Sequence, residues 1–368
     1  MIKILLTADL HWGTTRDGLS SLHACRAKTF ERIMSLAATH DLLLVAGDLF
    51  DGLGTDDPAY RAAAERFGAV LSGGTAIALV PGETECGDDG APLPVIDTLP
   101  ASRVFSLTDE GPLRLERGGE VVHVYGAPAR MPFDPARYAR TNDDGFHIGL
   151  FHGNFTVKED GDGAPVHTLT RELIRECNLD FFAVGHTHGF RIFKQQNRVI
   201  GASPGSPEAA ARTETGERSV LSIALENNEI TSIRRVIVNT AELRALELDC
   251  GACASDDALF DELAKNKSPV VHCTARLVGR REFFIDPARL DQLRREFLSL
   301  DITDESAPGL GALLGEFSRE NSLRGEFFSL LDDMRRRSAL PADVDETHLR
   351  SVLESLGRTG TYRGEDWR

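Results

Sequence analysis

Residues 41–52 read DLLLVAGDLFDG, an apolar run that ends in a turn with glycine and aspartate. The chain starts in the same way at 2–13, IKILLTADLHWG, where an apolar run gives way to aspartate and histidine. A third run, at 75–80, ends in the turn PGETE, and helix-like segments at about 20–40 and 58–72 separate the three runs. Continuous apolar runs that alternate with helical segments predict an α/β domain with largely buried strands.

The pattern becomes richer in strands after about residue 100. Strands are predicted at 120–128, 147–153, 181–188, 198–205, 220–226 and 230–238. Asn227 and Asn228 predict a hairpin turn between the last two, and a helix is predicted at 168–177. The segment 156–166, rich in Gly and Asp, is predicted to be a mobile loop.

The chain changes character after about residue 240. One small α/β unit follows, and the pattern is helical beyond Pro308, with a last helix near 343–356. Three domains are therefore predicted, over residues 1–240, 241–307 and 308–368.

Composition narrows the class of protein. The chain has 368 residues, and 41 basic against 57 acidic residues give a net charge of −16. This balance argues against a surface that binds nucleic acid by charge alone. Six cysteines are too few for a secreted disulfide framework, and no stretch approaches the roughly 18 apolar residues that span a bilayer. We expect a soluble cytoplasmic protein without a membrane partner.

Metal-binding side chains stand at five predicted strand ends. They are Asp9, His11, Asp48, Glu83, His152, His186 and His188. Ligands of open α/β sheets bind beyond the carboxyl ends of strands. Imidazole with carboxylate is a ligand set for Mn, Fe or Zn, whereas Mg and Ca prefer oxygen alone. Seven ligands are too many for one tetrahedral site and suit two metal ions that share a carboxylate bridge.

The order of these motifs resembles that of the calcineurin-like metallophosphoesterases. TADLHWG, GDLFDG and GHTH are most similar to the DNA-repair nuclease branch, which includes the SbcD nuclease subunit and the YhaO-type proteins. The resemblance covers residues 1–240 and, less closely, ARLVGR and NSLRGEFFSLL further along the chain. It implies a two-sheet β core flanked by helices as the nuclease domain, a small α/β cap domain over 241–307, and a C-terminal helical segment over 308–368.

The resemblance also implies roles for single residues. One metal ion would be held by Asp9, His11, Asp48 and His188, and the second by Asp48 as the bridge with Glu83, His152 and His186. Mn²⁺ is the expected ion, with Fe, Zn and Mg as alternatives. His152, Asp48 and Thr84 are the expected catalytic residues. Two cations lower the pKa of a bound water and stabilise charge on phosphoryl oxygens.

One loop departs from the family pattern. Relatives have Gly-Asn-His-Asp where this chain has Gly82-Glu83-Thr84-Glu85. Glu83 offers a charged oxygen on a longer side chain where the asparagine offers a neutral one. Thr84 replaces a histidine that the family is thought to use to protonate the leaving group, and a hydroxyl is no general acid near neutral pH. Losing such an acid costs roughly 10²–10⁴-fold in rate.

Three interpretations of this loop stay open. In the first, Glu83 is a ligand and the enzyme is slow, or uses water, His123 or His23 as its acid. In the second, the site binds metal and serves mainly as a scaffold. In the third, the loop points away as an acidic surface turn and one metal ion binds well. The first is favoured because the other six ligand positions match the family.

The predicted function is that of a dinuclear-metal phosphodiesterase acting on DNA, an exonuclease-like component of DNA repair. One alternative is a small-molecule or cyclic-nucleotide phosphodiesterase, which the acidic charge favours. The other is a catalytically weak scaffold subunit of a repair complex. In SbcD-like proteins the terminal helices dock onto a coiled-coil ATPase subunit, so an SbcC-like partner is expected here. Relatives often dimerise, so a homodimer is expected too.

Overall fold

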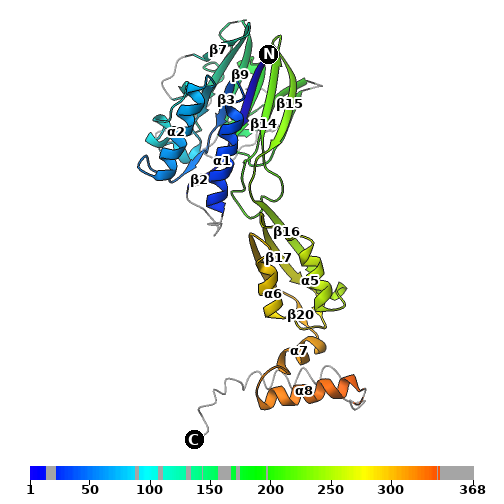
Figure 1. The fold of residues 1–368 in the computed structure, drawn as a ribbon. Coiled ribbons are helices and arrows are strands. Elements are labelled where there is room, and N and C mark those ends of the chain that lie inside the picture. Colours follow the sequence, from blue (N-terminus) through cyan, green and yellow to red (C-terminus); the bar gives the residue numbers. More distant parts are fainter. Residues whose placement is uncertain are drawn as a thin grey trace. The chain divides into compact units, whose positions relative to one another are not determined.

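The computed structural model describes residues 1–13, 22–87, 91–106, 111–129, 134–142, 144–155, 167–170, 175–195, 198–337 and 339. The chain divides into two compact units, Met1–Glu242 and Leu243–Arg368, which are treated separately (Figure 1). Among the described residues, no helix is long and apolar enough to cross a membrane.

The first unit contains a six-stranded sheet in the order β15-β14-β1-β3-β5-β6. Its strands are β1 (Ile2–Thr7), β3 (Leu42–Ala46), β5 (Ala76–Val80), β6 (Arg103–Val104), β14 (Ser219–Glu226) and β15 (Glu229–Ile237). Strands β1, β3, β5 and β6 are parallel, so their carboxyl ends meet at one edge. Strand β14 is antiparallel to both β1 and β15.

A second sheet has seven strands, in the order β12-β13-β11-β9-β8-β7, with β10 paired to β9. They are β7 (Leu113–Arg117), β8 (Glu120–Ala127), β9 (Phe146–Phe155), β10 (His167–Leu169), β11 (Phe181–Gly185), β12 (Arg191–Gln195) and β13 (Arg198–Ser203). The central strands β8, β9, β11 and β13 are parallel. The carboxyl ends of β9 and β11 therefore also lie at one edge.

The strands β1, β3 and β5 are buried on both faces almost throughout, which explains their uninterrupted apolar runs, whereas the edge strand β15 has no buried residue. Ile4 and Leu6 of β1 belong to the same buried cluster as Ile148 and Leu150 of β9, between the two sheets. Leu5 points the other way, into a cluster with residues of the helices. Since successive strand residues face opposite sides, a sheet covered on both sides needs apolar residues at every position. The prediction of an α/β fold with a two-sheet core flanked by helices is confirmed.

Helices α1 (His23–Ala37) and α2 (Pro58–Ser72) cover the outer face of the six-stranded sheet (Figure 1). Asp57 begins α2 by accepting a hydrogen bond from the Ala59 amide at 2.7 Å, and the following proline has the φ that a first turn needs. Short elements complete the unit: β2 (Trp12–Gly13), β4 (Phe50–Asp51), the 3₁₀ turn η2 (Glu83–Glu85) and α3 (Pro94–Asp97).

Local predictions for this unit had mixed outcomes. Asn227 and Asn228 form the predicted hairpin turn between β14 and β15, with positive φ angles of 53° and 59°. The helix predicted at 168–177 is wrong at its start, because β10 pairs with β9 there. Residues 175–177 are helical, and 171–174 and the predicted loop at 156–166 lie outside the described residues.

The second unit is built on a three-stranded sheet in the order β16-β17-β19. Its elements are β16 (Glu242–Asp249), η3 (Cys250–Ala252), α5 (Asp256–Ala264), β17 (Val271–Val278), β18 (Arg280–Arg281), α6 (Pro287–Arg294), β19 (Ser299–Asp304), β20 (Ala307–Pro308), α7 (Leu310–Phe317) and α8 (Leu323–Arg336). Leu259, Leu263, Ala275 and Leu277 belong to its core. The boundary predicted near residue 308 stays a prediction, and the helix predicted near 343–356 lies outside the described residues.

Two histidines are buried side by side in the second sheet. His123 of β8 stacks on His147 of β9 with ring centroids 4.6 Å apart and an interplanar angle of 13°. Neither ring nitrogen of His123 has a hydrogen-bond partner among the described residues. Burial lowers the pKa of His123, and the charge of Arg114 lowers it further. Burial also lowers the pKa of His147, with Arg140 and then His123 adding to the effect.

These histidines should make the protein acid-sensitive. Their pKa values in the folded state lie below the unfolded value of about 6.5, so the unfolded state binds more protons as the pH falls through that value. The contribution of these two histidines to the free energy of unfolding should therefore fall between pH 7.5 and pH 5.5. His123→Leu removes one of the groups, so this variant should lose less stability over that interval than the wild type.

The measurement is the urea midpoint of both proteins at the two pH values. An equal change in the urea midpoint of the wild type and the variant would contradict the assignment to His123, since the two proteins share every other titrating group.

Candidate metal centre

Six of the seven predicted ligands stand beyond the carboxyl ends of strands, and His152 lies within β9. Asp9, His11, Asp48 and His186 have positive φ angles of 54°, 49°, 51° and 87°. Such angles cost a non-glycine residue about 1–3 kcal/mol and concentrate at functional sites. Backbone hydrogen bonds hold the turns: the Asp9 amide donates to the carbonyl of Gly47 at 2.9 Å, and the His11 amide donates to the carbonyl of Asp48 at 3.0 Å.

Two glycines let the strand ends touch. A Cβ on Gly82 would lie 2.0 Å from Oδ1 of Asp48, and a Cβ on Gly185 would lie 1.8 Å from the carbonyl oxygen of Ala46. Neither oxygen can move away, since Asp48 is a candidate ligand and the carbonyl of Ala46 belongs to strand backbone. Glycine is therefore required where β5 and β11 approach the end of β3.

Asp9, His11 and His188 form the first cluster. One ligand atom from each lies within 4.8 Å of the other two. Nε2 of His11 lies 3.1 Å from Nε2 of His188, and Oδ2 of Asp48 lies 3.7 Å from Nε2 of His11. Both oxygens of Asp9 accept from the His186 amide, at 2.8 and 3.1 Å, which fixes the carboxylate. The geometry suits a cation held by two imidazoles and two carboxylates.

Glu83, His152 and His186 form the second cluster, again with ligand atoms within 4.8 Å of one another. Nδ1 of His152 donates to the carbonyl of Ala46 at 2.8 Å, so Nε2 carries the lone pair. This Nε2 and Oε1 of Glu83 are buried without a hydrogen-bond partner among the described residues. Oδ2 of Asp48 lies 3.4 Å from this Nε2, and Nδ1 of His186 lies 3.3 Å from this Oε1. Buried polar atoms normally make hydrogen bonds, so two such atoms without one fit a second cation.

Asp48 lies between the two clusters. Its Oδ2 is 3.4 Å from Nε2 of His152 and 3.7 Å from Nε2 of His11. Burial alone would raise the pKa of Asp48, but the charges of His152 and His11 hold it well below its usual range. An ionised carboxylate in this position suits a bridging ligand. The structure thus brings together all seven predicted ligands.

Protons compete with metal ions for these histidines. Burial would lower the pKa of His152, but the carboxylates of Asp48 and Asp9 raise it to about 9. Burial does lower the pKa of His186, and His152 lowers it further. A metal ion needs the neutral imidazole, so a bound ion would displace a proton from His152.

The loop that departs from the family pattern faces the centre. Oε1 of Glu83 is 3.3 Å from Nδ1 of His186, so this side chain is directed inward rather than toward solvent. Thr84 is held by Asp48: its amide and hydroxyl lie 3.1 and 3.0 Å from Oδ1, and the hydroxyl also lies 2.8 Å from the carbonyl of Phe50. The hydroxyl orients the candidate bridging carboxylate.

Glu85 is a structural residue of this loop that the sequence analysis missed. Its fully buried carboxylate accepts from the amides of Leu49, Phe50 and Gly82 at 2.8, 2.9 and 2.9 Å. It therefore ties the turn after β3 to the turn after β5. Burial, and then the charge of Asp48, raise the pKa of Glu85 to about 7.

Of the two histidines considered as replacement acids, His123 is in the wrong place. It stacks on His147, which precedes His152 by five residues in β9, or about 16 Å of extended strand. His23 is exposed at the start of α1, where its Nδ1 lies 3.0 Å from the carbonyl oxygen of Gly13.

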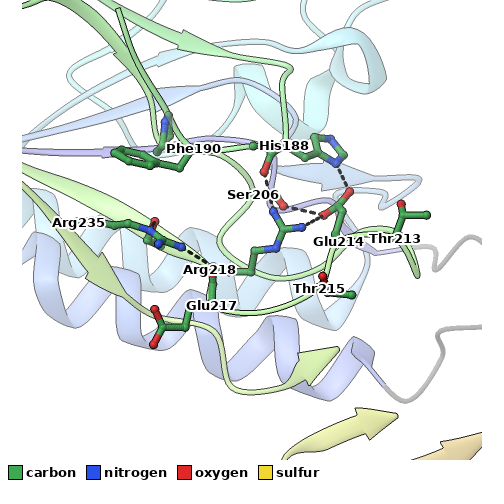
Figure 2. A pocket seen from close by; sticks show the side chains of 12 residues that line it. His188, Phe190, Ser206, Thr213, Glu214, Thr215, Glu217, Arg218 and Arg235 are labelled. Carbon is green, nitrogen blue, oxygen red and sulfur yellow. Dashed lines mark hydrogen bonds and ion pairs between the residues drawn. The ribbon is translucent and has the colours of Figure 1, made fainter. Parts of the chain in front are cut away.

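A carboxylate behind His188 is the second residue that sequence reasoning missed. Oε1 of Glu214 lies 2.5 Å from Nδ1 of His188 (Figure 2). Its other oxygen accepts from the Ser206 hydroxyl at 2.8 Å, the Ala210 amide at 3.0 Å and Arg218 at 3.1 Å. Burial would raise the pKa of Glu214, but the hydrogen bond and charge of His188, followed by Ala210 and Arg218, lower it to about 2. A carboxylate on the far nitrogen fixes the tautomer and makes Nε2 a stronger ligand.

His11 is supported in the same way. Its Nδ1 lies 3.2 Å from Oδ2 of Asp51, within the turn GDLFDG. Its carbonyl accepts from buried Arg26 at 2.9 Å. Both imidazoles of the first cluster therefore have a carboxylate at Nδ1 and Nε2 directed toward the centre.

Comparisons with known proteins agree with this geometry. Residues 2–190, just over half of the chain, match the family described as calcineurin-like phosphoesterase. The chain is 26% identical over 388 aligned positions to a Bacillus subtilis (strain 168) protein described as the uncharacterized metallophosphoesterase YhaO, covering 98% of this chain and 91% of that protein.

Solved structures are more distant. A dimetal phosphatase from Danio rerio is 10% identical with a TM-score of 0.39, over 65% of this chain and 98% of that one. A D62A mutant of Vps29 from Entamoeba histolytica is 13% identical with a TM-score of 0.30, over 65% of this chain and all of that one.

Glu214 gives a direct test of the first cluster. In Glu214→Gln a neutral amide replaces the carboxylate beside Nδ1 of His188, which makes Nε2 a weaker ligand. The affinity for the Mn²⁺ ion that His188 would bind should therefore fall by about 10- to 100-fold. Isothermal titration with Mn²⁺ measures this. Glu217→Gln, an exposed neighbour, is the matched control and should bind as the wild type does. Unchanged Mn²⁺ affinity in Glu214→Gln would show that Glu214 supports no ligand.

Proposed function

The chain belongs to the calcineurin-like phosphoesterase family, and we propose that it is a dinuclear-metal phosphodiesterase that cleaves DNA from an end. The coarser statement, that it is a metal-dependent phosphoesterase, follows from the family match and the two clusters of candidate ligands. The observation that carries the proposal is the position of Asp48 between these clusters, with the buried Nε2 of His152 directed at it.

The residues of the centre divide the work. Bound divalent cations, with Mn²⁺ as the proposed ion, supply an activated water and neutralise charge on the phosphoryl oxygens. The carbonyl of Ala46 holds a proton on Nδ1 of His152, and Glu214 and Asp51 engage Nδ1 of His188 and His11. All three imidazoles thus keep Nε2 available as a ligand.

The centre has no general acid at the position where the family has its loop histidine. Thr84 uses its hydroxyl on Asp48 and on the carbonyl of Phe50, and a hydroxyl does not give up its proton near neutral pH. The leaving oxygen must then take a proton from water. Turnover should therefore be slower by roughly 10²–10⁴-fold than in an enzyme with a positioned acid.

The choice of DNA rests on the motifs TADLHWG, GDLFDG and GHTH, which are similar to those of the repair-nuclease branch. A second unit after Glu242 suits a polymeric substrate. A small phosphodiester is the rival substrate, favoured by the net charge of −16, which repels a phosphate backbone. A weakly catalytic scaffold subunit is the second rival, favoured by Thr84.

The proposed partners follow from the same likeness. Helix α8 exposes Phe327 and Leu330, which are 41% and 60% exposed, and an SbcC-like coiled-coil ATPase is the proposed partner for the C-terminal helices. A homodimer of this chain remains part of the proposal.

The substrate is tested with Mn²⁺-dependent hydrolysis of end-labelled linear DNA beside a chromogenic phosphodiester. We expect both to be cleaved, with products that shorten the DNA from its ends. Cleavage of the chromogenic diester alone would contradict the choice of DNA and support the small-molecule rival.

The loop is tested by the double substitution Glu83→Asn with Thr84→His. The new imidazole restores a group that can protonate the leaving oxygen, so kcat should rise by about 10²-fold or more. Glu83→Asn alone is the control, because it changes the candidate ligand without adding an acid. No gain in the double variant would favour the scaffold rival.

A further inference from the structure

Two cavities of the first unit meet at Phe190 and Arg235. The smaller, of about 260 Å³, lies beside the candidate metal ligand His188 (Figure 2). The larger, of about 910 Å³, is a groove between the edge strands β12 and β15. Its lining includes Phe190, Ile192, Lys194, Arg198, Ile233 and Arg235. Since both cavities include the same two residues, they adjoin there, and we treat them as one path whose inner end is lined by His188 and Glu214.

We propose that this path binds a single-stranded DNA end, with one base stacked on Phe190, a phosphate against Arg235, and the strand continuing past Lys194 and Arg198. The inference rests on the proposed function and specifies the form of its substrate. The larger groove has more basic than acidic side chains in its lining, whereas the chain as a whole is acidic.

Phe190 is placed to stack on a base. It follows His188 by two residues and is 41% exposed, although large aromatic side chains are normally buried well. The guanidinium carbon of Arg235 lies 5.5 Å from its ring centroid, an arrangement that steadies the ring. Proteins that bind single strands combine such aromatic platforms with a cationic groove along the backbone.

The cations along the path are only partly neutralised. Lys194 makes no ion pair among the described residues. Arg235 donates to the Ser219 hydroxyl at 2.8 Å and to the backbone carbonyl of Glu217 at 2.5 Å rather than to a carboxylate. Arg198 lies 3.6 Å from Asp180, and that aspartate is also paired with a second arginine. Asp180 and Glu229 are the acidic residues of the groove's lining, so its three cations leave an excess of one positive charge in a chain of net charge −16.

The groove is unsuited to an added β-strand, the other extended occupant. The ladder of β15 is broken by a bulge at Thr231, where the register shifts between Ala224 and Leu225 of β14. The pairing of β12 with β13 also shifts, between Phe193 and Lys194. Bulges and lysine on an edge strand oppose pairing with another strand. The two edges bound the groove from both sheets, which suits one nucleic-acid strand.

The test is binding of fluorescein-labelled oligo(dT) to the full chain, followed by anisotropy in EDTA so that metal ions play no part. Phe190→Ala should weaken binding by about 5- to 150-fold, the range for one lost base stack. Lys194→Ala with Arg198→Ala should reduce the slope of log K against log salt by about 1.4. Arg114→Ala with Arg117→Ala, on exposed positions of the opposite edge strand β7, is the matched control and should leave both quantities unchanged.

The inference is overturned if the wild type does not bind oligo(dT) at low salt, if both groove variants bind within twofold of it, or if polyglutamate of equal charge competes as well as the oligonucleotide. Hydrolysis of the chromogenic diester with Mn²⁺ separates this from the proposed function. Groove variants should keep the wild-type rate on that substrate. Oligonucleotide binding that depends on Phe190 in a protein that hydrolyses nothing would support the groove and refute the enzyme.

Discussion

The metal centre depends on direct backbone contact between strand ends of two different sheets. Gly185 of β11 lies against the carbonyl of Ala46 at the end of β3, and Gly82, after β5, lies against Asp48. This contact leaves the chain no room for an ordinary turn. Four of the candidate ligands, Asp9, His11, Asp48 and His186, therefore adopt left-handed φ angles, a strain that the buried strands on either side must support. The apolar core between the sheets is thus what holds the ligands in place.

Much of this arrangement could be predicted from the sequence, because its signals are local. Apolar runs that end in Gly47-Asp48 or Gly185-His186 mark both the strands and the ligands. Glu214 could not be found in this way. It reaches His188 across 26 residues, through a hydrogen bond that no spacing rule encodes. The same holds for β10, which is a strand only because β9 lies beside it, and for the groove, which joins edges of separate sheets.

The loop after β5 changes the chemistry of the centre and leaves the backbone around it in place. Glu85 keeps the loop in place through three backbone amides, so the changes at Glu83 and Thr84 concern the centre itself. The carboxylate of Glu83, in addition to those of Asp9 and Asp48, would bind cations more tightly and reduce the net positive charge of the centre by one. Weaker polarisation of phosphoryl oxygens and the missing acid act in the same direction. Our proposal is therefore a dinuclear metal centre with slow turnover.

Its central claim is that Glu83 belongs to the second of two metal sites. The most direct measurement is anomalous diffraction from crystals of the protein grown with Mn²⁺. The account predicts two peaks on either side of Asp48, with an oxygen of Glu83 at about 2.2 Å from the peak nearer His152 and His186. A single peak among Asp9, His11 and His188, with Glu83 turned to solvent, would contradict it.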